Sequence, residues 1–158
     1  MAILPVAAGF LTGCSPLYVL DTLVPAGEYG LNSDISYGDL PRQKLDIYRP
    51  AKPDTASPVI VFFYGGSWKS GERGQYRFVG EALTDYRLYP NVTFPSFMTD
   101  AARAVRWVRD NLDAGNGQTR PLFIGGHSAG AHIAALLAVD RQYLNKEDLS
   151  AQTLCGVI

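Results

Sequence analysis

The spacing of apolar residues predicts several short strands. Residues 58–64 form a continuous apolar, β-branched and aromatic run that ends at a glycine pair, which is typical of a strand buried on both faces. Residues 121–124 and 154–158 are shorter runs of the same kind. Residues 44–50 alternate between apolar and polar side chains, and with residues 34–37 they predict an antiparallel hairpin near the start of the fold.

Longer periodic segments predict helices between and after these strands. Apolar side chains at helical spacing over residues 97–112 form one face, and Arg103, Arg106 and Arg109 fall outside it. Residues 129–139 are rich in alanine and leucine and follow a strand directly, which predicts a second helix. Strands that alternate with helices predict an α/β fold with a mostly parallel sheet, whose functional sites lie at the carboxyl ends of the strands.

One segment departs from this alternation. Residues 76–83 have a helix-like pattern and run through Thr84 directly into Asp85, with no strand pattern between them. A missing strand would leave the edges of its neighbours unpaired and apolar faces exposed. This predicts a chain of low stability that tends to associate.

Composition and charge narrow the class of protein. The 158 residues are 47% apolar and 18% charged, as in a globular domain, and 14 Lys and Arg nearly balance 15 Asp and Glu. Since no basic run is interleaved with aromatic residues, nucleic acid is not expected as a partner. The two histidines, His127 and His132, have no carboxylate or thiol at ligand spacing, so no metal site is expected.

The amino-terminal segment has the pattern of an export signal. Residues 1–13 contain no charged side chain, are too short to span a membrane and suit the apolar part of a signal peptide. The motif LTGC at residues 11–14 resembles the bacterial lipobox, which implies an exported cell-envelope lipoprotein tethered to the membrane through lipidated Cys14. Because no positive charge precedes the apolar run, a buried apolar arm stays open as an alternative. Residues 14–32 are predicted as a tether or arm, and residues 33–158 as the folded domain.

The strongest chemical signal is the segment GGHSAG at residues 125–130. A serine hydroxyl becomes a useful nucleophile when it is held exposed beside a base, and Gly-x-Ser-x-Gly between a strand and a helix provides that exposure. Ser128 is the predicted nucleophile, and the backbone N–H of Ala129, at the positive end of the following helix, is predicted to stabilise an oxyanion. The alternative role for Ser128 is a helix N-cap. His127 and His132 are interpreted as packing residues.

A second glycine cluster follows the strand at residues 58–64. Gly65, Gly66 and Ser67 let the backbone approach a substrate closely, and they are predicted to supply the other donors of an oxyanion hole. Both glycine clusters follow strands, so we expect them to meet at the carboxyl end of the sheet.

Several other conspicuous residues are interpreted as structural. Aromatic residues near a sheet usually belong to the core, so Trp68, Tyr76 and Tyr89 are interpreted as core residues rather than as a substrate pocket. Arg73 is interpreted as a surface charge, and Asp85 as a structural carboxylate rather than the acid of a catalytic triad.

Three motifs in this order resemble a known group of proteins. The motifs FFYGGSWKSGER, DYRLYPNVTFPSFMTDAARAVRWVRDN and GGHSAG are similar to those of α/β-hydrolase esterases and acetyl hydrolases, which include hormone-sensitive-lipase-like, feruloyl and acetyl-xylan esterases. The resemblance spans residues 37–158. It implies an α/β-hydrolase-type sheet with flanking helices that is incomplete at the carboxyl terminus and lacks one internal strand. Tyr64 stands where that group has histidine.

The resemblance implies a serine hydrolase that acts on small-molecule carboxylic esters through an acyl-enzyme intermediate and needs no cofactor. In that group the acid and the histidine of the triad follow the serine, and no residue after Ser128 matches them, so we expect both to be missing from this chain. Two alternatives stay open. One is a catalytically inactive hydrolase fragment or lipid-tethered binding module, and the other is an arylformamidase-like amide hydrolase. The sequence predicts no oligomeric state.

Overall fold

The computed structural model describes residues 29–52, 57–79, 82–112 and 119–158. Its elements in chain order are β1 (Tyr29–Ser36), β2 (Lys44–Pro50), β3 (Val59–Phe63), the 3-10 helix η1 (Arg73–Val79), β4 (Ala82–Thr84), α2 (Ser96–Asn111), β5 (Leu122–Gly126), α3 (Ala129–Val139), α4 (Arg141–Asn145), the 3-10 turn η2 (Ala151–Thr153) and β6 (Gly156–Val157). Strands and helices alternate as the apolar pattern predicts, which confirms the α/β class.

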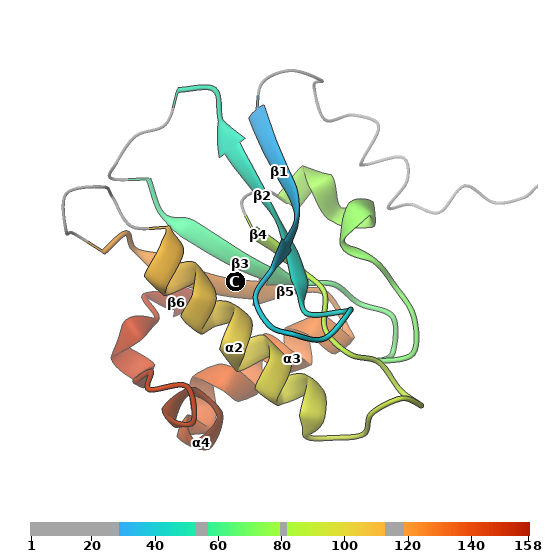
Figure 1. Cartoon of the computed structure of the whole chain (residues 1–158). Coiled ribbons are helices and arrows are strands. Elements are labelled where there is room, and N and C mark those ends of the chain that lie inside the picture. The colour runs from blue at the N-terminus through green and yellow to red at the C-terminus, as the bar shows by residue number, and fades with distance from the viewer. Residues whose placement is uncertain (1–28, 53–56, 80–81, 113–118) are drawn as a thin grey trace, which may run out of the picture.

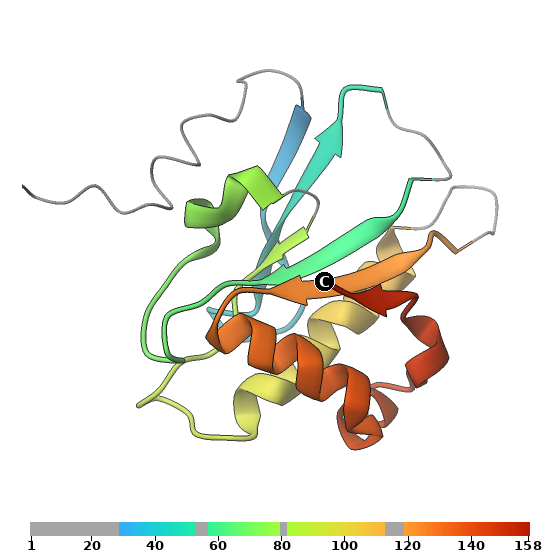
Figure 2. The ribbon, with the colours of Figure 1, turned by 180° about the vertical axis from the view of Figure 1, so that it is seen from behind.

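The strands form one mixed sheet in the order β1-β2-β4-β3-β5-β6. The predicted antiparallel hairpin is confirmed in β1 and β2, and β4 is also antiparallel to β2, whereas β3, β4, β5 and β6 run parallel. Figures 1 and 2 show η1 on one side of the sheet and α2, α3 and α4 on the other. Because β3 and β5 are parallel neighbours, the loops that follow them meet at the same end of the sheet.

The structure corrects one part of the expected sheet, because a strand lies where the sequence predicts none. Ala82, Leu83 and Thr84 form β4, which is buried and pairs with both β2 and β3. The segment is extended because its neighbours offer hydrogen-bond partners on both sides, a tertiary effect that the local pattern does not contain. β4 is short, however. It pairs with residues 45–47 of β2 and residues 61–63 of β3, and the rest of both strands has no partner in β4.

The side chains of β3 alternate in burial. Val59, Val61 and Phe63 are buried, whereas Ile60 and Phe62 are half-buried. The ring of Phe62 packs against Tyr76 of η1, so the half-buried side chains lie on the face that carries η1. Both faces of the strand are covered, as expected, but η1 covers its face less completely than α2 and α3 cover the other.

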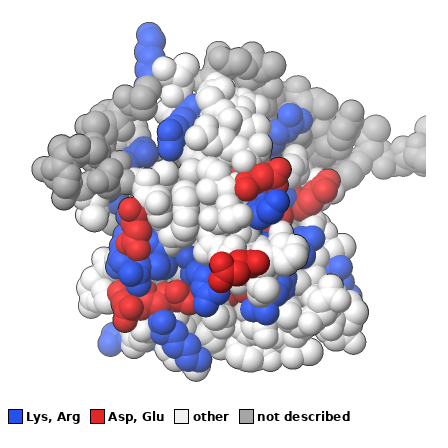
Figure 3. Space-filling model, viewed as in Figure 1, with Lys and Arg blue, Asp and Glu red and all other residues white. Residues whose placement is uncertain are grey.

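Charged side chains outside the apolar face of α2 form ion pairs at the surface. Arg103 pairs with Glu147, and Arg106 pairs with Asp110 and Asp148. Figure 3 shows acidic and basic side chains mixed over this view of the molecule rather than gathered by sign. Exposed pairs of this kind contribute little to stability, because water and salt screen the charges. The buried apolar face of α2 therefore holds the helix on the sheet.

The amino-terminal predictions lie mostly outside the described residues. Residues 1–13 and Cys14 are not among them. β1 begins at Tyr29, so the sheet starts before the domain boundary predicted at residue 33. In the ranges that the structure describes, no helix is both long and apolar enough to cross a membrane.

Candidate active site

Ser128 occupies a sharp turn between β5 and α3. β5 ends at Gly126 and α3 begins at Ala129, so the chain changes direction within His127 and Ser128. Ser128 has φ 53° and ψ −114°, a conformation that L-residues rarely adopt, and it is exposed. Ser128 occupies the N-cap position of α3, but its side chain makes no capping hydrogen bond. The strained turn leaves the hydroxyl accessible, as a nucleophile requires.

The glycines around Ser128 make this turn sterically possible. A Cβ on Gly126 would lie 2.3 Å from the carbonyl carbon of Gly130, and a Cβ on Gly130 would lie 1.9 Å from the carbonyl oxygen of Phe63. Both contacts would be clashes with backbone. Two hydrogen bonds fix the turn in the same place: His127 N–H donates to Phe63 O at 3.1 Å, and Gly130 N–H donates to His127 O at 2.8 Å. The turn is therefore held against the end of β3.

The loop after β3 lies beside the Ser128 turn. A Cβ on Gly65 would lie 2.7 Å from His127 Nδ1 and 3.1 Å from Ser128 Cβ. Gly66 has φ 136° and Ser67 has φ 53°, so the loop bends sharply after Gly65. Gly65, Gly66, Ser67 and Ser128 all line one hollow of about 410 Å³. The structure thus brings the predicted nucleophile and the predicted oxyanion loop together.

The backbone donors around this hollow differ in their partners. The N–H of Gly65 donates to the hydroxyl of Tyr76 at 3.3 Å. The N–H groups of Gly66, Ser67 and Ala129 donate to no acceptor among the described residues. The amides of Gly66, Ser67 and Ala129 are thus not used to hold the loops among the described residues, whereas the amide of Gly65 is.

Tyr64 anchors the start of the loop rather than lining the hollow. Its buried ring stacks on Tyr86 with 4.7 Å between ring centroids, and Arg42 donates both to its hydroxyl and to the carbonyl of Gly71. Burial raises the pKa of Tyr64 to about 12. The charge of Asp85 also raises this pKa, whereas Arg42 lowers it. The residue that stands in place of histidine is therefore a packed, neutral support for the loop.

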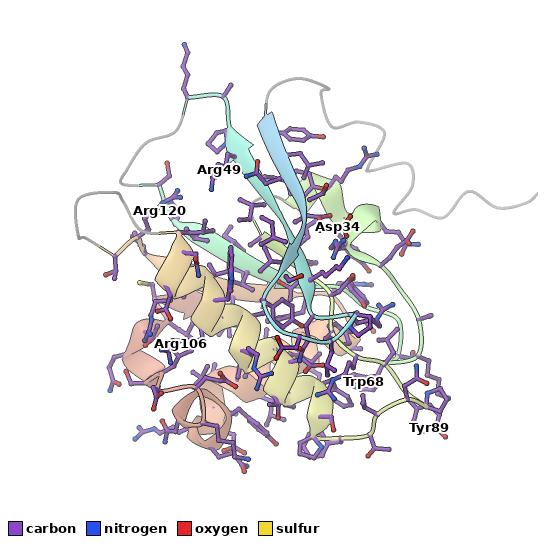
Figure 4. All side chains as sticks on the ribbon, viewed as in Figure 1. Asp34, Arg49, Trp68, Tyr89, Arg106 and Arg120 are labelled. Carbon is purple, nitrogen blue, oxygen red and sulfur yellow. The ribbon has the colours of Figure 1, made fainter. Side chains whose placement is uncertain are left out.

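A second hollow, of about 230 Å³, shares Ser67 with the first and has aromatic walls formed by Trp68, Tyr89, Phe94 and Phe97. Figure 4 shows Trp68 and Tyr89 at the same end of the molecule as the loop after β3. The interpretation of Trp68 and Tyr89 as core residues is therefore wrong in part: Trp68 packs on the core from the rim of this hollow, and Tyr89 is 49% exposed. Its apolar walls suit a hydrophobic group of a ligand.

Neither histidine of the chain touches the Ser128 hydroxyl. His127 Nδ1 lies 3.0 Å from the hydroxyl oxygen of Tyr76, and the ring of His132 packs edge-on against Trp68 with 5.5 Å between centroids. Across the part of the chain that the structure describes, no group of His, Cys, Asp and Glu side chains is placed to hold a metal ion. The described residues therefore bring the predicted nucleophile and the predicted oxyanion loop together, but place no base in contact with the Ser128 hydroxyl.

Arg73 lies in a cluster of carboxylates next to the site. It pairs with Asp34 of β1, with Asp46 of β2 at 2.9 Å and with Asp85, which follows β4, at 3.0 Å. Its side chain is only 12% exposed, so the interpretation as a surface charge is wrong. Burial raises the pKa of Asp85, and Arg73 opposes that shift. Asp85 is structural, as the sequence predicts, because its carboxylate forms an ion pair with Arg73 in this cluster.

Comparison with known proteins assigns the chain to a family. The profile of the BD-FAE family matches residues 45–153, a range that includes both the loop after β3 and the Ser128 turn. The chain belongs to the BD-FAE family. Curated relatives of this BD-FAE chain are named as esterases. It is 36% identical over 116 residues to isoprenylcysteine alpha-carbonyl methylesterase ICME of Arabidopsis thaliana, and 33% identical over 144 residues to esterase LipC of Mycobacterium tuberculosis.

The BD-FAE chain spans only part of these relatives. The matched region is 68% of this chain and 27% of ICME, and 78% of this chain and 35% of LipC. Among solved structures, esterase B from Lactobacillus rhamnosis is 26% identical with a TM-score of 0.65, covering 78% of this chain and 44% of that one. A truncated carbohydrate esterase from gut microbiota is 26% identical with a TM-score of 0.62, covering 75% and 47%. These similarities confirm the expected α/β-hydrolase esterase fold.

Sequence reasoning missed two residues that support the site. Tyr76 contacts Gly65 and His127, and Arg42 holds Tyr64 and Gly71. Neither residue lies in a motif that marks its role, and each acts on partners distant in sequence. Their roles follow only from the positions of the elements in space.

Proposed function

We propose that this protein is a carboxylic ester hydrolase with Ser128 as its nucleophile. The observation that carries the proposal is the strained, exposed turn at Ser128, which faces a hollow shared with Gly66 and Ser67. The names of the BD-FAE relatives support an ester substrate. The aromatic hollow that begins at Ser67 would receive an apolar group of that ester.

The geometry supports acyl-enzyme chemistry. Ser128 Oγ attacks the ester carbonyl carbon while a base removes the hydroxyl proton, and the carbonyl oxygen becomes negatively charged. The N–H groups of Gly66, Ser67 and Ala129 donate to that oxygen. Collapse of the tetrahedral intermediate breaks the bond to the alcohol, which leaves with the proton, and water then releases the acid from Ser128. No step in this sequence needs a cofactor.

The general base is proposed to come from outside these 158 residues. His127 is engaged with Tyr76, His132 packs against Trp68, and neither is bonded to Ser128. The matched region covers 27% and 35% of the two named relatives, so a histidine elsewhere in a longer protein is consistent with their length. The chain on its own should therefore be a poor catalyst.

Added imidazole tests the nucleophile without the missing base. We expect a fluorophosphonate probe to label the 158-residue chain slowly, and imidazole to accelerate labelling by about 10-fold or more, because it supplies general-base catalysis. Ser128→Ala should abolish labelling at every imidazole concentration, whereas Ser150→Ala, at an exposed position away from the hollow, should leave it unchanged. Absence of any Ser128-dependent labelling would contradict the proposal and favour a non-catalytic module.

Substrate preference separates ester from amide chemistry. With imidazole present and the rate of Ser128→Ala subtracted, because imidazole alone also cleaves activated esters, p-nitrophenyl acetate should be consumed faster than an N-formyl arylamine, since the alcohol of an activated ester leaves more easily than an amine. The reverse order would favour the arylformamidase-like alternative.

We also propose that the protein is exported and tethered to the cell envelope through lipidated Cys14. The lipobox-like motif at residues 11–14 supports this proposal, although Cys14 lies outside the described residues. Expression in a bacterium that is fed labelled palmitate should label the wild type and Cys155→Ser but not Cys14→Ser. Equal label in all three would exclude a lipid on Cys14.

A further inference from the structure

The hydroxyl group of Tyr76 contacts both loops of the site. It accepts a hydrogen bond from Gly65 N–H at 3.3 Å, and it lies 3.0 Å from Nδ1 of His127. Gly65 begins the oxyanion loop, and His127 immediately precedes Ser128. We propose that Tyr76 is a positioning residue that ties these two loops together and holds His127 as a hydrogen-bond donor at the hollow. This inference rests on the proposed function, because it concerns the same site.

The hydrogen-bonding capacity of each group favours one arrangement of protons. Gly65 N–H donates to the Tyr76 oxygen, and the hydroxyl proton of Tyr76 can point to Nδ1 of His127. A neutral imidazole that accepts at Nδ1 carries its proton on Nε2. His127 then presents an N–H donor to an oxygen of a bound ester instead of a lone pair to the Ser128 hydroxyl.

The surroundings of Tyr76 suit a positioning role. Its side chain is 3% exposed, and its ring packs against Phe62 of β3 with 5.5 Å between centroids. η1 is kinked at this residue, where φ −125° and ψ 23° are not helical. A buried ring held against the central sheet gives its hydroxyl a defined place. His127, by contrast, is exposed, and the contact with Tyr76 fixes the orientation of its ring.

The hydrogen bond between Gly65 and Tyr76 bears on the position of the oxyanion loop. Donors stabilise an oxyanion only when they are held at hydrogen-bonding distance from the place where the charge develops. Tyr76 holds the Gly65 amide, and the next two residues, Gly66 and Ser67, line the hollow shared with Ser128. Tyr76→Phe removes only the hydroxyl and should let both loops move.

The first test measures the protonation of His127 directly. The chain has two histidines, so ¹⁵N spectra of the imidazoles are simple, and His127→Gln identifies the His127 signals. At about pH 8 we expect an unprotonated Nδ1 and a protonated Nε2 in the wild type. Tyr76→Phe should shift His127 toward a mixture of both forms, and Tyr143→Phe, a buried control on α4, should not. A wild-type His127 protonated mainly on Nδ1 would overturn the inference.

The second test measures the reactivity of Ser128 in the presence of imidazole. We expect Tyr76→Phe to lower the rate constant of fluorophosphonate labelling by about 10-fold, less than the loss of an oxyanion donor itself, with little change in the probe concentration that gives half-maximal rate. Tyr143→Phe should label as the wild type does. Equal labelling of Tyr76→Phe and wild type would overturn the positioning role.

The two tests distinguish failure of this inference from failure of the proposed function. If the wild type is not labelled at Ser128, the proposed function fails and Tyr76 has no reaction to support, whatever the imidazole spectra show. If the wild type is labelled but Tyr76→Phe changes neither labelling nor the His127 signals, only the inference about Tyr76 fails. The wild-type spectrum needs no variant, so it remains decisive if Tyr76→Phe does not fold.

Discussion

Gly130 sets how closely the first turn of α3 approaches the end of β3. A Cβ at this position would lie 1.9 Å from the carbonyl oxygen of Phe63 and 2.7 Å from that of Tyr64. Gly130→Ala should therefore displace the Ser128 turn, lower the free energy of unfolding by about 2–4 kcal/mol and reduce Ser128 labelling. Urea denaturation measures the first effect. Gly74→Ala is the matched control, because a Cβ there meets nothing within 4 Å, and equal losses in both variants would contradict this explanation.

The sequence predicts the roles of some residues of the site but not of others. Ser128 and the glycines around it lie in one short motif, so the strand-to-helix context is enough to predict a strained turn. Tyr76 and Arg73 act through partners on other elements. Nothing in the sequence near Arg73 indicates that three carboxylates from separate strands and loops surround it. Local patterns therefore predict the nucleophile, but not the residues that support the site around it.

Among the elements, β4 shows the same limit of local patterns. Its three residues are too few to show a period of two, and the preceding residues have a helical pattern. The longer elements β3, α2 and α3 were predicted close to their observed bounds, because each repeats its pattern over several residues. A short strand between two longer ones is determined by its neighbours, which a single sequence does not place.

Arg73 connects η1 to the sheet through ion pairs. It lies on η1 and pairs with carboxylates of β1, β2 and the segment after β4. Arg73→Met should lower the free energy of unfolding by about 3 kcal/mol at neutral pH, since it leaves buried carboxylates without their cation. The loss should be smaller near pH 4, because without Arg73 the pKa of Asp85 rises further and the carboxylate takes up a proton.

Urea denaturation at both pH values measures the effect of Arg73→Met. Arg103→Met is the control, because Arg103 is 42% exposed and pairs only at the surface with Glu147. A similar loss of stability in the two variants, or a loss at Arg73 that does not depend on pH, would show that the cluster has no special role.

For the whole molecule, low stability stays a prediction, but its structural reason changes. The internal strand expected to be missing is present as β4, yet β4 bridges only part of β2 and β3, and the face that carries η1 leaves Ile60 and Phe62 half-buried. We expect the free energy of unfolding of the isolated chain to be less than about 5 kcal/mol, which is the lower end of the usual range. Sedimentation velocity should show association that increases with concentration. A monomer that unfolds cooperatively with a larger free energy would contradict both expectations.

The buried tyrosines predict how the whole fold responds to alkaline pH. Burial raises the pKa of Tyr37 and Tyr86, and it raises that of Tyr64 to about 12 from an ordinary value of 10.0. A group whose pKa is raised by folding stabilises the fold fully below its unfolded pKa, and this contribution is lost as the pH rises through the folded pKa. Stability should therefore fall between about pH 10 and pH 12.

Urea denaturation together with phenolate absorbance checks the alkaline transition. The buried tyrosines should ionise only as the chain unfolds, and Tyr64→Phe should weaken the pH dependence. Tyr89→Phe should not, because Tyr89 is half exposed. Ionisation of all tyrosines with ordinary pKa values while the fold persists would contradict the prediction.

The parallel pairing of β3 with β5 also bears on how the chain folds. The hydrogen bond from His127 N–H to Phe63 O joins segments separated by β4 and all of α2, so the Ser128 turn cannot be held beside the loop after β3 until β5 docks against β3. Pairings between such distant segments form slowly compared with local helices, because a long loop must close first. The Ser128 turn should consequently gain protection from hydrogen exchange late during refolding, after α2 and α3 have formed. During synthesis, the loop after β3 leaves the ribosome well before its partner strand exists.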